Sequence, residues 1–190
     1  MNTTEHIVES YFRLVRHCFT VTDVKVINGN NRQFDLLAFD KNREEAFHIE
    51  VAVTHQLNWQ TALPSFEEVI DYKFLGKPRP KENPSKNTDV ARGKSYLPYI
   101  TKTYESFGIN CEKLNRIICV WHIDERSEKV NEFLRNKEVR CKFPSKSLSF
   151  LFFRDEVMPS LLETVGKSNY DDDILRSFSL IREFQEQTKR

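Results

Sequence analysis

Two acidic residues lie on neighbouring segments that alternate like β-strands and are joined by a short polar turn. Asp35 belongs to the first segment and Glu50 to the second, and a turn centred on Asn42 and Arg43 would place position 35 opposite position 50. Directly opposed side chains of an antiparallel pair are about 4.5–5.5 Å apart at Cβ, where like charges repel. A divalent cation would offset this repulsion, since Mg²⁺ is typically bound by one or two carboxylates together with water and phosphate oxygens.

A metal-free explanation of the same two residues stays open. A shift of one residue in the hairpin would move the carboxylates to opposite faces, and either acid could pair with a nearby lysine or arginine. Burial favours the metal site, because the first segment carries apolar residues on both of its faces, as a covered central strand does. These residues are Phe34, Leu36 and Ala38 on one face, and Leu37 and Phe39 on the other. A buried carboxylate needs a partner.

The order of these features resembles the PD-(D/E)XK nuclease superfamily. The shared features are a first helix with an acidic residue, a strand, a second strand with an aspartate between hydrophobic residues, and a third strand reading Ile49-Glu50-Val51. The resemblance covers roughly the first third of the chain, and beyond it the order of elements is compatible. It implies a restriction-endonuclease-like α/β/α layered core, with a central mixed sheet flanked by helices, and Mg²⁺-dependent cleavage of nucleic acid. The family's catalytic acids fall on Asp35 and Glu50.

The resemblance also implies further metal ligands. Family members often add an acid from the first helix, and Glu5 has apolar residues at the family's spacing, three and seven positions later. Its charge is equally what the helix dipole favours in a first turn, while Glu9 and Arg13 are spaced as a surface ion pair. Mg²⁺ is the expected cofactor and Mn²⁺ its substitute. The implied ligands are Glu5, Asp35, Glu50 and the backbone carbonyl of Val51.

One position departs from the family motif. The family has a lysine two residues after the glutamate, where this chain has Ala52, whose methyl group cannot polarise a phosphate or orient a water. Lys73, on the next predicted helix, is the nearest replacement, followed by His48 and His55. Because helix lysines are routinely exposed, Lys73 is interpreted as solvent-facing and is left out of the predicted site. A catalytically degenerate relative that binds nucleic acid or a partner protein is the alternative function.

Length and composition bound the other possibilities. The 190 residues fit a single domain, 1–190, that can bury a sizeable core. A net charge of +1 gives no global attraction to nucleic acid, so any contact needs a local patch. The four cysteines lack Cys-x-x-Cys spacing, which argues against zinc. Without a signal-peptide pattern or a run of about 18 apolar residues, a cytoplasmic protein with no membrane contact is expected.

The basic, proline-rich loop at 76–94 is the best candidate for a nucleic-acid contact. Its prolines keep it extended, and its cations could follow a phosphate backbone, with DNA expected ahead of RNA. The alternative is a solvated insertion. The predicted nucleic-acid-binding residues are Lys77, Arg79, Lys81, Lys86, Arg92 and Lys94.

The remaining segments alternate between helix and strand patterns, which predicts a layered α/β/α domain. Thr4 is the predicted cap of the first helix, Ser65 and Glu68 form a predicted capping box, and Pro98 is expected to interrupt a helix. The C-terminal helix at 171–189 either packs on the core or forms a contact in a homodimer. The predicted strands lie at 21–27, 115–124, 139–143 and 148–153, and the predicted helices at about 5–16, 65–76, 90–107 and 127–136.

Overall fold

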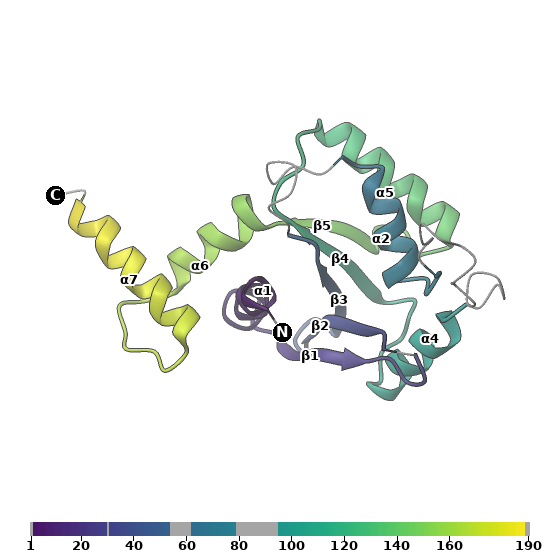
Figure 1. Cartoon of the computed structure of the whole chain (residues 1–190), viewed down its shortest axis with the longest axis horizontal. Helices are drawn as coiled ribbons and strands as arrows, with labels where there is room; N and C mark the ends of the chain where they lie inside the picture. The colour runs from purple at the N-terminus through teal and green to yellow at the C-terminus, as the bar shows by residue number, and fades with distance from the viewer. Residues whose placement is uncertain (1, 30, 54–61, 79–94, 189–190) are drawn as a thin grey trace.

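The protein, seen in a computed structural model, is built on a five-stranded mixed sheet with helices on both faces (Figure 1). The structure describes residues 2–29, 31–53, 62–78 and 95–188. The strands follow chain order across the sheet: the first three form an antiparallel meander, and the last three are parallel. They are β1 (Phe19–Lys25), β2 (Gln33–Asp40), β3 (Glu45–Val51), β4 (Leu114–Val120) and β5 (Leu148–Phe152). The expected α/β class with a flanked mixed sheet is therefore confirmed.

Helices cover the two faces in separate groups (Figure 1). One face carries α1 (Thr3–Leu14), the π-helical turn η3 (Phe153–Val157), α6 (Met158–Thr164) and α7 (Asp173–Thr188). The other face carries α2 (Ser65–Lys73), α4 (Leu97–Ser106) and α5 (Ser127–Cys141). In the described part of the chain, no helix has the length and hydrophobicity that crossing a bilayer requires.

The hairpin of β2 and β3 has the register that its turn predicts. Leu36 pairs with Ile49 and Leu37 with His48. One step further along the strands, this register aligns position 35 with position 50. Leu36 and Ile49 belong to the apolar cluster beneath α1. Because successive side chains of a strand alternate between faces, Asp35 and Glu50 project to the opposite side, where α2 lies.

Two predicted helix caps are wrong. The first helix is capped by Asn2 instead of Thr4, since the Asn2 side chain accepts a hydrogen bond from the Glu5 amide at 3.0 Å, and the Glu5 carboxylate accepts one from the Asn2 amide at 2.8 Å. This reciprocal pair satisfies two amides that a helix start leaves without partners. The predicted box at Ser65 does not form, because α2 is preceded by Pro64 and has no side-chain cap.

The strand predicted at 139–143 is also wrong. Helix α5 continues to Cys141 and ends at Lys142, which has a left-handed conformation with φ 56°. Val130, Phe133, Leu134 and Cys141 recur at helical spacing and pack in one apolar cluster, and this longer pattern prevails over the local alternation.

Pro98 does not interrupt a helix. It lies within the first turn of α4, which begins at Leu97, where a missing amide hydrogen has no intrahelical partner to lose. The predicted start of this helix, at 90–94, lies outside the described residues. The turn η3 and the short helix α6, at 153–164, were not predicted.

Candidate functional site

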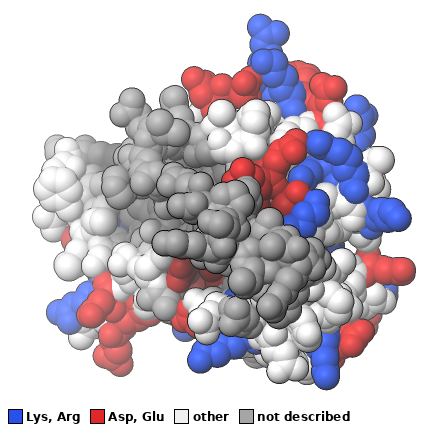
Figure 2. Space-filling view, turned by 45° about the vertical axis from the view of Figure 1, so that its right-hand side comes forward, with Lys and Arg blue, Asp and Glu red and all other residues white. Residues whose placement is uncertain are grey.

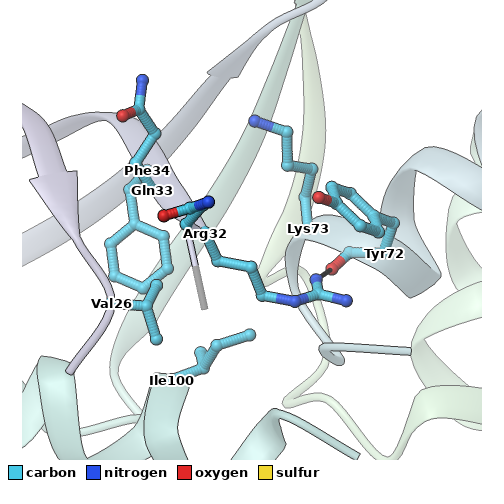
Figure 3. A pocket seen from close by; sticks show the side chains of 8 residues that line it. Val26, Arg32, Gln33, Phe34, Tyr72, Lys73 and Ile100 are labelled. Atoms are coloured by element: carbon cyan, nitrogen blue, oxygen red, sulfur yellow. Dashed lines mark hydrogen bonds between the residues drawn. The ribbon is translucent and has the colours of Figure 1, made fainter. Parts of the chain in front are cut away.

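Two carboxylates from neighbouring strands meet one lysine from a helix. Lys73 Nζ, at the end of α2, lies 3.2 Å from Asp35 Oδ1 and also contacts Glu50 Oε2. The other oxygen of Asp35 accepts a hydrogen bond from the Val51 amide at 2.8 Å. Figure 3 shows the Lys73 side chain extending from its helix toward the strands. The two predicted catalytic acids are thus held close together around a shared ammonium group.

The interpretation of Lys73 as a solvent-facing residue is wrong. Its side chain is only 20% exposed and forms ion pairs with both acids. The sequence contained a signal for this position: Phe66 and Ile70 are buried on α2, and Lys73 follows Ile70 by three residues, which places all three on one stripe of the helix. Ala52, at the family's lysine position, packs against an apolar cluster.

Burial and mutual repulsion set the charge states of the two acids. Burial is the largest cause that raises the pKa of Asp35, to about 6, and the charge of Glu50 adds to it, against the opposing effects of Lys73 and the Val51 amide. Burial also raises the pKa of Glu50, although Lys73 acts to lower it. Burial by itself would lower the pKa of Lys73, but the two carboxylates raise it above its usual value. The pair therefore needs a cation, and Lys73 is held protonated to supply it.

A buried histidine connects Glu50 to a buried tyrosine. His48 Nε2 lies 2.6 Å from Glu50 Oε1, and His48 Nδ1 lies 2.6 Å from the hydroxyl of Tyr104 on α4. Burial and the charge of Lys73 lower the pKa of His48 well below its usual value, so the ring is neutral. Burial raises the pKa of Tyr104, which keeps its proton. His48 thus cannot replace the family lysine as a cation. Its contact with Glu50 follows from their spacing of two residues, which places both side chains on one face of the strand.

The predicted helix ligand does not join the two acids. The Glu5 carboxylate is hydrogen-bonded to Asn2 at the start of α1, and α1 packs on the face opposite Glu50. Glu9 is not a simple surface ion pair either, because it is buried and accepts a hydrogen bond from Thr20 at 2.7 Å in addition to its contact with Arg13. The carbonyl of Val51 stays a predicted ligand.

The remaining donor set is compatible with Mg²⁺. Within the described ranges, no group of three or more acidic, histidine or cysteine side chains is arranged to hold a metal ion. Two carboxylates are nevertheless enough, since Mg²⁺ completes its shell with water and substrate oxygens. The two carboxylates face the single ammonium of Lys73, so the group keeps a net negative charge when both acids are ionised. Asp35 and Glu50 are thus the residues that would hold the ion.

A small hollow of about 90 Å³ adjoins Lys73 (Figure 3). Arg32 lies in its wall and donates hydrogen bonds to the Tyr72 carbonyl at 2.6 Å and the Lys77 carbonyl at 3.0 Å. The guanidinium also lies over the rings of Tyr72 and Tyr96, 4.1 and 4.5 Å from their centroids. Arg32 therefore fixes the end of α2, from which Lys73 extends.

Of the six residues predicted to bind nucleic acid, only Lys77 is described. It is exposed, and its ammonium pairs with Asp71 at 2.8 Å. On the face in Figure 2, the acidic and basic side chains that are described lie interspersed over the surface. The other five, Arg79, Lys81, Lys86, Arg92 and Lys94, lie outside the described residues.

Comparisons of the chain with protein-family models, with curated proteins and with solved structures gave no match. The resemblance to the PD-(D/E)XK superfamily therefore stays a hypothesis. Function has to be argued from the chemistry of the site, because a fold by itself does not determine an activity.

Proposed function

We propose that the protein is a Mg²⁺-dependent nuclease that hydrolyses phosphodiester bonds in nucleic acid, with DNA as the expected substrate. The observation that carries this proposal is the convergence of Asp35 and Glu50 on the ammonium of Lys73. A carboxylate pair on adjacent strands beside a partly buried lysine would provide metal ligands and a fixed positive charge at one place. The restriction-endonuclease-like version of the layered fold is part of the proposal, supported by the order of a helix, an antiparallel meander and a parallel crossover.

Each residue of the group has a separate role in this proposal. When bound by Asp35 and Glu50, Mg²⁺ would lower the pKa of a water and neutralise charge on the phosphate. Asp35 is held in place by the Val51 amide at Oδ2, so Oδ1, which contacts Lys73, keeps a fixed direction. Lys73 stabilises the negative charge that develops on the phosphate oxygens, as preorganised cations do in sites shielded from water. It would thus perform from α2 the task of the family lysine that Ala52 replaces.

A cleavage assay with matched variants tests this proposal. The full chain is incubated with single-stranded, duplex and branched DNA and with RNA, each with Mg²⁺, with Mn²⁺ or with EDTA. Asp35→Asn, Glu50→Gln and Lys73→Met remove one group each at nearly constant volume. Lys129→Met is the control, because Lys129 is an exposed helix lysine whose described partner, Glu125, lies four residues away on the surface.

The proposal requires metal-dependent cleavage by the parent and the control, and a loss of at least about 100-fold in each of the three site variants, as removal of a transition-state-stabilising group typically causes. Cleavage that persists in Asp35→Asn or Glu50→Gln, or in EDTA, contradicts it. A contaminating nuclease is recognised because it would be unaffected by any of the substitutions.

A second candidate is a catalytically inactive member of the same fold that binds nucleic acid or a partner. The observation in its favour is that Lys73 already pairs with both carboxylates while Ala52 packs against an apolar cluster, so the ammonium offsets part of the repulsion between the acids without a metal. Salt-sensitive binding of nucleic acid without cleavage, unchanged in Asp35→Asn and Glu50→Gln, would support this candidate over the nuclease.

A further inference from the structure

Tyr104, His48 and Glu50 form a continuous row of hydrogen-bonded side chains on the side of the sheet where the proposed metal site lies. The row runs from the hydroxyl of Tyr104 through the ring of His48 to one carboxylate oxygen of Glu50, with both hydrogen bonds at 2.6 Å. His48 is fully buried, and Glu50 and Tyr104 are 1% and 2% exposed. Phe34 and Phe74 pack against the imidazole, with ring centroids 4.2 and 4.8 Å away. The row is thus enclosed by aromatic rings.

The hydrogen bonds of this row run in one direction. A neutral imidazole has one donor and one acceptor nitrogen. Glu50 can only accept when ionised, so His48 donates from Nε2, and its Nδ1 must then accept from the Tyr104 hydroxyl. Each hydrogen-bond donor in the row is therefore matched with an acceptor. The row therefore selects the Nε2–H tautomer and one ring orientation of His48.

The consequence for Glu50 is that its two oxygens have different tasks. Oε1 is engaged by His48, whereas Oε2 faces Lys73 on the side where Asp35 lies. Without the donor from His48, Oε1 would be a buried acceptor with no partner, and the carboxylate would rotate to find one. Such a rotation would turn Oε2 away from the place where the two acids converge.

We propose that His48 and Tyr104 are positioning residues that orient Glu50 so that a single carboxylate oxygen is presented, with Asp35, to a divalent cation. This inference rests on the proposed function, and it concerns groups that touch neither metal nor substrate. Partners that hydrogen-bond to ligating carboxylates generally tune a site by about 10- to 100-fold in metal affinity.

Calorimetric titration of the full chain with Mn²⁺ tests the proposal without relying on cleavage. His48→Leu removes the donor to Glu50, and His48→Gln restores one, since the glutamine amide nitrogen can take the place of Nε2. Tyr104→Phe removes only the hydroxyl at the far end of the row. Phe74→Leu is the matched control, because it disturbs packing on the His48 ring and removes no hydrogen bond.

We expect His48→Leu to weaken Mn²⁺ binding by about 10- to 100-fold, His48→Gln to recover most of the loss, and Tyr104→Phe to have a smaller effect in the same direction. Phe74→Leu should bind like the parent. Affinity equal to that of the parent in His48→Leu, or equal weakening in His48→Gln and His48→Leu, overturns the positioning role alone.

Two further outcomes keep the test decisive. If His48→Leu fails to fold, the comparison of Tyr104→Phe with Phe74→Leu decides, and equal affinities overturn the proposal. If the parent itself shows no Mn²⁺ binding, the proposed nuclease function fails, and the positioning role fails with it.

Discussion

Alternate residues of β3 place apolar side chains on one face of the central sheet and polar side chains on the other. On β3, Phe47 and Ile49 enter the apolar cluster beneath α1. Their immediate neighbours, His48 and Glu50, face α4 and α2 and form a chain of hydrogen bonds and ion pairs with Tyr104 and Lys73. The side-chain period of two in a strand is what separates these surroundings.

This difference indicates that apolar burial and the group of charged side chains lie on opposite sides of β3. Burial of apolar area is the main favourable contribution to folding, and the face beneath α1 supplies much of it. Removing charged groups from water costs free energy that their mutual attraction only partly offsets. The polar group around Glu50 is thus a poor place to gain stability, although apolar clusters beneath α2 and α4 surround it. Substitutions can test this polar group and the apolar face beneath α1 separately.

The largest expected effect on stability comes from the apolar face. Phe12 on α1 is fully buried and packs against Phe47, with ring centroids 5.8 Å apart. Phe12→Ala should lower the free energy of unfolding by about 3–5 kcal/mol, because it leaves a cavity as well as losing apolar contacts. Urea denaturation measures this loss. Mn²⁺ affinity, measured below the unfolding transition, should stay within about twofold of the parent, and a parallel loss of affinity would show that the faces are not independent.

Removing the shared cation should be the next largest effect. Lys73→Met leaves Asp35 and Glu50 facing each other without a counter-charge, which should destabilise the metal-free protein by about 3 kcal/mol at neutral pH. Mn²⁺ should then raise the melting temperature more than it does in the parent, because no ammonium competes for the carboxylates. Differential scanning calorimetry with and without EDTA measures both effects. An equal or smaller Mn²⁺ shift in Lys73→Met would contradict this account.

Substituting Arg32 disturbs the polar face without changing the charges of Asp35, Glu50 or Lys73. Arg32→Met removes two hydrogen bonds to backbone carbonyls near the end of α2 and the guanidinium contacts with Tyr72 and Tyr96. We expect a loss of about 2 kcal/mol in stability and, in the cleavage assay, a lower rate from the displacement of Lys73. Arg43→Met is a suitable control, since Arg43 lies on the β2–β3 turn and its exposed side chain pairs with Asp40. Stability unchanged relative to this control would exclude an anchoring role.

The smallest expected effect lies where α7 joins the apolar face. Asp172 accepts hydrogen bonds from the Ile174 and Leu175 amides at 3.0 Å and contacts His6 on α1. Burial alone would raise the pKa of Asp172, but the Leu175 amide and His6 lower it below its usual value. A lowered pKa in the folded state means that this stabilisation is complete above about pH 4 and is lost as the pH falls further.

Asp172→Ala should cost about 1 kcal/mol, as the loss of a helix cap does. Asp172→Asn should keep most of the cap and abolish the local pH dependence. Urea titrations between about pH 3 and pH 7, a range that spans the ordinary titration of a carboxylate, compare the two variants with the parent. An identical acid-dependent loss in Asp172→Asn and the parent would rule out Asp172 as its source.

The hairpin of β2 and β3 was predictable because its register depends on residues that are close together in the chain. The polar turn at Asn42 and Arg43 predicted the register that β2 and β3 adopt, in which Leu36 pairs with Ile49 and the next positions along are Asp35 and Glu50. The strand predicted at 139–143 failed for a related reason: five residues of alternation were interpreted without the longer helical pattern of α5, from Ser127 to Cys141, in which they are embedded.

The sequence by itself determined the class of the fold and the two acids that lie opposite each other, because strand periodicity and turn chemistry depend on residues close together in the chain. Only the tertiary structure decided that Lys73, 23 positions after Glu50 in the chain, supplies the cation, and that His48 joins Glu50 to Tyr104. The physical reason is that the approach of a helix to a sheet is set by the packing of whole apolar faces. Which polar groups then meet is a consequence of that packing.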